Sequence, residues 1–198
     1  GTSGWQTGNQ LSSLEAYLNI LERVPGSVNQ FNHPGTAYGT FDGFRDYNPR
    51  YDRLMQLMEV FGEPGTEYLS EYFMALDAGW HLAPTNNQDN HKGRWGNAND
   101  ARDVVLTDDF TEDGIYEAIR NRRMYATEDK NLELDYTVNG NMMGSIIDVP
   151  EKLSFEVSFN DPDRTDSIAK VELVVNSGKV AYTWNSAADL AKGSVSVE

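Results

Sequence analysis

The fold of this chain is decided by the stretch Trp80-His-Leu-Ala-Pro-Thr-Asn-Asn-Gln-Asp-Asn-His91. Its first part is apolar and its second part polar, a pattern typical of a buried strand that ends at a loop. Residues at positions i and i+2 of an extended segment point the same way, so Asp89 and His91 can converge on one point. A carboxylate oxygen and an imidazole nitrogen that converge suit a divalent transition metal. We therefore predict part of a metal site just after this strand.

Other segments repeat this succession of a short apolar run and a polar loop. His33 follows the run 28–31, and Glu59 lies near the end of the run 54–61. Between these runs, apolar residues at helical spacing predict helices. The expected strands are 28–31, the end of 54–61, 80–84 and 103–107, and the expected helices are 11–21, 69–76 and one that begins after Thr111. Because the active site of an α/β barrel lies where its strands end, these polar residues are expected at one rim.

The pattern changes near residue 130. From there apolar and polar residues alternate over 132–138, 153–159 and 171–175, with a turn at 176–178. Alternation with period two in several short runs predicts antiparallel strands. We expect an α/β part over residues 1–131 and a small sandwich-like β part over residues 132–198.

Composition narrows the class of partner. The chain has 198 residues, a formal net charge of −15 and no cysteine. The negative charge argues against binding nucleic acid through its phosphates and against docking on an anionic membrane. The absence of cysteine excludes disulfides, a thiolate zinc site and a cysteine nucleophile. No apolar run approaches the roughly 20 residues that span a bilayer. A small-molecule substrate is the partner that these features favour.

The order of the motifs resembles a known family. Asn32-His33-Pro34, Glu59 in Met-Glu-Val-Phe-Gly, and Asp89-Asn90-His91 are similar to the later half of the PHP (polymerase and histidinol phosphatase) family. The run 118–129 resembles the segment that leaves the barrel in one branch of that family, which often carries a C-terminal β domain. The resemblance implies an α/β fold: the C-terminal part of a distorted (β/α)7 PHP-type barrel, followed by a small antiparallel β-sandwich-like domain.

The resemblance also implies a function and a set of site residues. The family contains metal-dependent phosphoesterases, so a phosphoester, or a related ester, amide or carbamate bond, is the expected substrate. The expected cofactors are two or three divalent transition metal ions, zinc, manganese or iron, which activate water and polarise the scissile bond. The positions that match metal ligands of the family are His33, Asp89 and His91. The positions expected to line the site are Glu59, Asn32 and Gln88.

The sequence departs from the family in two places. The family opens with a His-x-His strand, whereas the histidines here are His33, His81 and His91 alone. The closing motif of the family usually follows Gly-Ser, whereas Asn87-Gln88 stands here. We expect the missing ligands upstream of residue 1, so that this chain is a C-terminal fragment of a longer enzyme and inactive by itself. Unpaired barrel edges would then favour a homo-oligomer or strand exchange.

Each candidate residue also has a simpler interpretation. Asp89 and His91 can form a solvated polar turn, and His33 can hydrogen-bond its own loop before Pro34. Glu59 can be an ordinary carboxylate at a strand end. His81 follows Trp80 in an apolar strand, so it is expected to be a hydrogen-bonded residue of the core or barrel wall rather than a ligand.

Two alternatives to the hydrolase interpretation remain. In the first, the chain is purely structural, a degenerate barrel that has lost its metal. In the second, the β part binds carbohydrate or a partner, because Tyr182 and Trp184 alternate with Thr183 and both rings can stack on a sugar. Core packing is the commoner fate of such a pair. An acidic chain without cysteine fits an extracytoplasmic protein, periplasmic or secreted, which we favour, as well as a cytoplasmic one.

Overall fold

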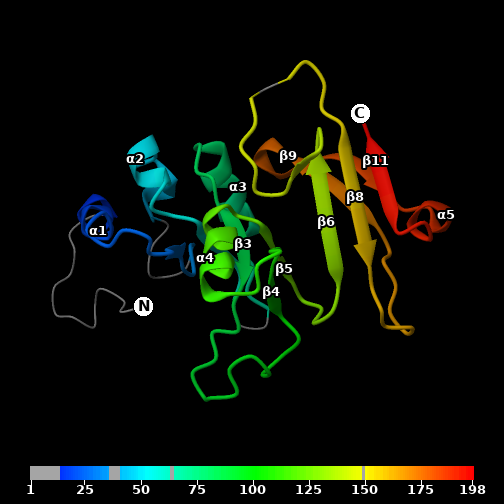
Figure 1. Ribbon diagram of the computed structural model, residues 1–198, viewed down its shortest axis with the longest axis horizontal. Helices are drawn as coiled ribbons and strands as arrows, with labels where there is room; N and C mark the ends of the chain where they lie inside the picture. The colour runs from blue at the N-terminus through cyan, green and yellow to red at the C-terminus, as the bar shows by residue number, and fades with distance from the viewer. Residues whose placement is uncertain (1–13, 36–40, 63–64, 149) are drawn as a thin grey trace.

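The computed structural model describes residues 14–35, 41–62, 65–148 and 150–198. It is a mixed α/β structure with short helices and several small sheets. We call residues 14–131 the α/β part and residues 132–198 the β part. Figure 1 shows the helices α1 to α4 on the left and the long strands of the β part on the right. None of the described helices has the length and hydrophobicity needed to cross a membrane.

The α/β part is built on a parallel sheet of three strands in the order β1-β2-β3. Gln30 of β1 pairs with Leu57 of β2, which in turn pairs with Ala83 of β3. Parallel neighbours require a crossover between them, which explains why helices separate these strands in sequence. The elements are α1 (Leu14–Leu21), β1 (Gln30–Phe31), η2 (Phe41–Phe44), α2 (Pro49–Asp52), β2 (Leu57–Phe61), α3 (Leu69–Asp77) and β3 (Ala83–Asn86).

Most of these elements lie where the sequence predicts them. The helix predicted over 11–21 is seen from Leu14 onward, and its predicted first residues lie outside the described residues. The strand predicted over 80–84 is displaced, because β3 begins at Ala83. The reason is tertiary: the Trp80 indole N–H donates to the Phe44 carbonyl at 2.8 Å, which holds Trp80 in the core ahead of the strand.

The core of the α/β part is an aromatic cluster centred on Phe31. The Phe31 ring lies 5.4 Å from the Phe44 ring and 5.2 Å from the Trp80 ring, both with nearly perpendicular planes. Edge-to-face pairs of this kind are favoured by the ring quadrupole. All three side chains are at most 1% exposed. Burying each of them contributes about 1.5–3 kcal/mol to folding, so this cluster fixes where β1 and β3 begin.

The remainder of the α/β part is an antiparallel pair that flanks β3. The sequence predicts the first strand, and it predicts the helix after Thr111, whose hydroxyl accepts the Gly114 N–H at 3.1 Å. It does not predict the second strand, which lies inside the segment taken as the exit from a barrel. The elements are β4 (Arg102–Val105), α4 (Glu112–Arg120) and β5 (Met124–Thr127). The described residues form no closed barrel.

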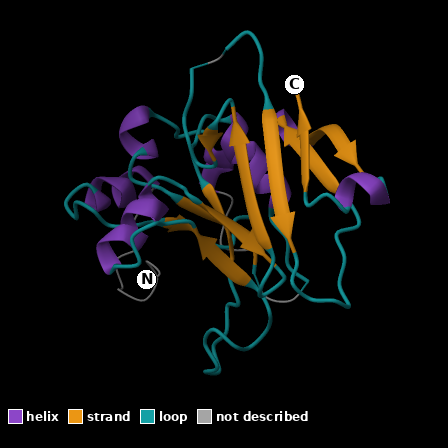
Figure 2. Cartoon of the chain, turned by 45° about the vertical axis from the view of Figure 1, so that its right-hand side comes forward, coloured by secondary structure: helices purple, strands orange, loops and turns teal. Residues whose placement is uncertain are grey.

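The β part contains two antiparallel sheets, as the alternating pattern predicts. The larger has the order β11-β8-β6-β7, and β9 and β10 form the smaller. Figure 2 shows the long strands of the larger sheet side by side. A hydrophobic cluster that includes Phe159, Trp184 and Val195 joins the two sheets. The elements are β6 (Glu133–Val138), β7 (Asn141–Met142), β8 (Phe155–Asn160), β9 (Val171–Val175), η3 (Asn176–Gly178), β10 (Lys179–Trp184), α5 (Ala187–Leu190) and β11 (Ser194–Val197).

The β part contacts the α/β part through η3, the turn between β9 and β10, which packs on α3. The Ser177 main-chain N–H donates to Asp77 Oδ1 at 3.0 Å, and its hydroxyl donates to Oδ2 at 2.7 Å. These two hydrogen bonds lower the pKa of Asp77. Gly178 lies so close to Phe73 that a Cβ at this position would stand 2.6 Å from the ring. The turn is therefore fitted to α3 by both polar and steric contacts.

The steric fit of this turn can be tested with a matched pair of substitutions. Gly178 and Gly140 have similar backbone angles, φ +71° and +75°, but a Cβ at Gly140 would meet nothing within 4 Å. Gly140→Ala should cost about 1 kcal/mol of unfolding free energy, from left-handed backbone strain alone. Gly178→Ala should cost about 1–3 kcal/mol more, because the methyl group collides with Phe73. Urea unfolding of both variants measures the difference, and equal losses would disprove the close contact.

Candidate functional site

The carboxyl ends of β1, β2 and β3 meet at one edge, because the three strands are parallel. His33 follows β1, Glu59 lies in β2, and Asp89 follows β3. The pairing of β2 with β3 shifts register between Glu59 and Phe61. This edge therefore collects the polar residues that the sequence places after its apolar runs.

Glu59 is the buried centre of this edge, with 3% of its surface exposed. The His33 main-chain N–H donates to its Oε2, and the Asn87 side chain also hydrogen-bonds to the carboxylate. Burial raises the pKa of Glu59, the nearby charge of Asp89 raises it further, and the two hydrogen bonds oppose the shift. Residues that follow β1 and β3 thus interact with one carboxylate on β2.

A glycine makes room for this carboxylate. A Cβ at Gly62 would stand 2.6 Å from Glu59 Oε1, so a larger residue would displace the acid from its place. The polar loop residues expected to line the site lie close by in sequence. Asn32 is exposed and accepts a hydrogen bond from Gln30 Nε2 at 2.6 Å, and Gln88 is half-buried just beyond β3.

Asp89 and His91 do converge, but through a turn at Asp89 and not through the extended segment on which the prediction rests. His91 Nε2 lies 2.8 Å from Asp89 Oδ1, and the two side chains are 78% and 44% exposed. Asp89 has a φ of +41°, so the chain turns sharply at this residue. The Trp95 indole N–H donates to the Asn90 carbonyl at 3.1 Å, and Trp95 itself is 82% exposed. The pair therefore stands on an open loop beside an exposed indole ring.

The three predicted ligands are not gathered as one group. Within the described residues, no ligand atoms of His33, Asp89 and His91 all lie within 4.8 Å of one another. What the structure does bring together is the Asp89–His91 pair and, separately, the His33 main chain with Glu59. Two imidazoles and a carboxylate are nevertheless ligand types that bind zinc, manganese or iron. The residues thus fit a transition metal in chemistry, and the pair fits it in spacing.

The structure also brings together an acidic cluster that the sequence patterns did not predict. Asp129, Asp161 and Asp166 each place one carboxylate oxygen within 4.8 Å of the others. They lie on the loops after β5 and β8, and the spacing Asp161-Pro-Asp163-Arg-Thr-Asp166 was the available signal. Such an all-oxygen set suits hard cations such as Ca²⁺ better than zinc. It contains none of the predicted ligands.

His81 is hydrogen-bonded, as expected, but it is not a core residue. Its Nδ1 lies 2.7 Å from Asp52 Oδ2, its main-chain N–H donates to Asp52 Oδ1 at 2.8 Å, and its side chain is 40% exposed. It precedes β3, at the opposite end of the strand from Asp89. Of the three histidines, His33 and His91 therefore follow strands, whereas His81 precedes one.

Comparison with protein-family models, with curated proteins and with solved structures finds no match for this chain. The PHP resemblance of residues 32–34, 59 and 89–91 therefore stays a prediction. Any function has to be inferred from the residues and their placement.

The loop that carries Asp89 is anchored by Asp103 of β4. Its Oδ1 accepts the Asn86 main-chain N–H at 2.7 Å at the end of β3. Although the residue keeps exposed surface, desolvation of its carboxyl group raises its pKa to about 6, against the effect of that hydrogen bond. The folded state therefore holds this proton more tightly than the unfolded chain, for which the value is 3.8.

Asp103 should make stability fall as the pH rises from about 4 to about 6. Asp103→Asn keeps an acceptor for Asn86 but has no proton to lose, so its stability relative to the parent should increase over this range. Partial exposure limits the effect to about 1 kcal/mol. Thermal unfolding at several pH values measures it. Asp108→Asn removes the same charge from an exposed loop, and a similar pH trend in that variant would contradict the assignment to Asp103.

Proposed function

We propose that this chain contributes to a metal-dependent hydrolase of the PHP type. The substrate class is a phosphoester or a related ester, amide or carbamate bond. His33, Asp89 and His91 are the residues proposed to hold zinc, manganese or iron, with two or three ions in the complete site. The observation that carries the proposal is that residues following β1 and β3 both hydrogen-bond to Glu59 of β2, at one edge of the parallel sheet.

The edge has the properties that such a site needs. Side chains that follow parallel strands face a common space, which is where ligands bind in α/β folds. Asp89 and His91 are accessible to solvent, so an ion and a small substrate can reach them. A bound divalent ion supplies an activated water and polarises the bond to be cleaved.

The residues around the proposed ligands have supporting roles. Glu59 accepts the His33 N–H and thereby fixes the loop that carries this imidazole, so it is a positioning residue. Asn87 hydrogen-bonds to the same carboxylate and ties the loop after β3 to it. Asn32 and Gln88 are proposed to line the substrate space. Trp95 offers an exposed ring beside Asn90 against which an apolar part of the substrate can lie.

Metal binding to this chain tests the proposal. Thermal stability is the readout for the parent chain, and calorimetric affinity is the readout for the variants. Zinc chloride at about 100 times its Kd should stabilise the folded state by about 2.7 kcal/mol. Asp89→Asn and His91→Ala should each weaken zinc binding at least tenfold, measured by isothermal titration calorimetry. His81→Ala is the matched control, because it removes a histidine outside the proposed site. Equal loss of affinity in His81→Ala would contradict the assignment.

His33→Ala separates a shared site from a surface chelate. If one ion bridges the loops after β1 and β3, this variant should lose as much affinity as His91→Ala. Retention of parental affinity would mean that Asp89 and His91 bind zinc by themselves, and the hydrolase proposal would fail. The measurement is zinc affinity and not hydrolysis. The sequence lacks the His-x-His pair of the family, so this chain is expected to be inactive by itself.

A further inference from the structure

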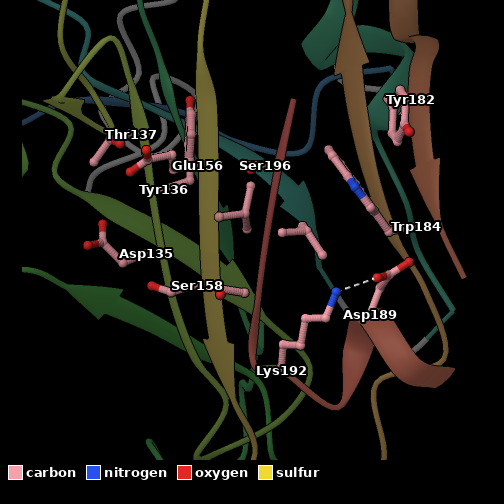
Figure 3. Close-up of a pocket in the computed structure, with 13 residues that line it drawn as sticks. Asp135, Tyr136, Thr137, Glu156, Ser158, Tyr182, Trp184, Asp189, Lys192 and Ser196 are labelled. Carbon is pink, nitrogen blue, oxygen red and sulfur yellow. Dashed lines mark hydrogen bonds and ion pairs between the residues drawn. The ribbon is translucent and has the colours of Figure 1, made fainter. Parts of the chain in front are cut away.

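The β part contains a cavity far in sequence from the proposed metal site. Its volume is about 710 Å³, and it extends around β11, the edge strand of the larger sheet. Val195 of β11 faces Trp184 of β10, whereas Asp135, Glu156 and Ser158 belong to the opposite face of the β6-β8-β11 sheet. Figure 3 shows Tyr182 and Trp184 on one side of β11 and Asp135 and Ser158 on the other.

Two aromatic rings on β10 form a wall of this cavity. The rings of Tyr182 and Trp184 lie 4.5 Å apart between centroids, with 46° between their planes. Trp184 is 8% exposed and belongs to the hydrophobic cluster with Val195, whereas Tyr182 is 46% exposed. A β-bulge between Val180 and Tyr182 precedes the pair, and bulges commonly re-aim side chains near binding sites. The buried ring thus supports an exposed one.

An ion pair stands beside this aromatic wall. Lys192 Nζ lies 2.8 Å from Asp189 Oδ1, and both side chains keep exposed surface, 65% and 44%. Both residues come from the connection between β10 and β11, and Figure 3 shows the pair below Trp184. An exposed carboxylate and an ammonium retain lone pairs and N–H groups that can bind hydroxyl groups of a ligand.

Charge and the exposed ring indicate the ligand class. Beside the aromatic wall, the carboxylate of Asp189 and the ammonium of Lys192 balance each other, and the whole chain has a formal net charge of −15. The negative charge of the chain as a whole disfavours anionic ligands. An exposed aromatic ring favours a ligand with an apolar face, and the ion pair favours one with hydroxyl groups at its edge. A neutral sugar ring combines these properties.

We infer that this cavity is a binding site for a neutral carbohydrate, whose ring stacks on Tyr182 while its hydroxyl groups bind Asp189 and Lys192. The site uses no residue of the proposed metal centre. Its occupancy therefore does not depend on whether the chain hydrolyses anything.

Calorimetric titration of the whole chain tests this inference. The probes are cellobiose, maltose and N,N′-diacetylchitobiose, with digalacturonate as the anionic counterpart. At least one neutral disaccharide should bind with a Kd of about 1 mM or tighter, and digalacturonate should bind at least tenfold more weakly. Absence of binding by all three neutral sugars, or equal binding of digalacturonate, would overturn the inference.

Variants assign the binding to the cavity. Tyr182→Ala should weaken the disaccharide at least tenfold, whereas Tyr182→Phe, which keeps the ring, should stay within threefold of the parent. Tyr116→Ala is the matched control, because Tyr116 is a similarly exposed tyrosine, 42%, on α4. Parental affinity in Tyr182→Ala, or an equal loss in Tyr116→Ala, would show that the sugar binds elsewhere. Circular dichroism of each variant confirms that it is folded.

Discussion

The parallel alignment of β1, β2 and β3 depends on the burial of Trp80 and Phe31 in one aromatic cluster. Each ring is almost fully buried, and the indole N–H is satisfied by the Phe44 carbonyl 36 residues away in sequence. A buried indole without a partner would cost about 1–3 kcal/mol, so this hydrogen bond lets the largest side chain of the core lie inside. Because the two residues stand at β1 and just ahead of β3, their contact sets where the outer strands of the sheet begin.

The same alignment brings Glu59 into the protein interior. Burial of a carboxylate is unfavourable unless donors replace water, and here the donors are the His33 main chain and the Asn87 side chain. These donors come from the two neighbouring strand ends, so the acid connects three segments that are distant in sequence. A buried acid of this kind adds little net stability, and its value is that it fixes the positions of the loops.

The two parts of the chain carry different kinds of surface. The edge of the parallel sheet presents imidazole and carboxylate groups, whereas the β part presents an aromatic wall with an ion pair. The contact between η3 and α3 joins the parts through Ser177 and Asp77. A metal-dependent hydrolase that also binds carbohydrate would place its chemistry on the first surface and substrate recognition or attachment on the second.

Local patterns in the sequence were sufficient to predict the elements that depend only on residues near one another in the chain. The helix α4 follows from Thr111 and its apolar face, and the turn at 176–178 follows from its glycine. These features involve residues only a few positions apart, so propensity and periodicity determine them. The alternating runs after residue 130 likewise determined an antiparallel β part.

Only the tertiary structure decided the features that join distant segments. The start of β3 depends on the hydrogen bond between Trp80 and Phe44, and β5 forms because β4 offers it a partner. The hydrogen bond from His33 to Glu59 and the cluster of three aspartates likewise require chain segments far apart in sequence. The side-chain types in a sequence indicate which chemistry is available. Bringing distant segments together costs loop-closure entropy, and only the whole packed core offsets that cost. The fold therefore determines which distant side chains meet.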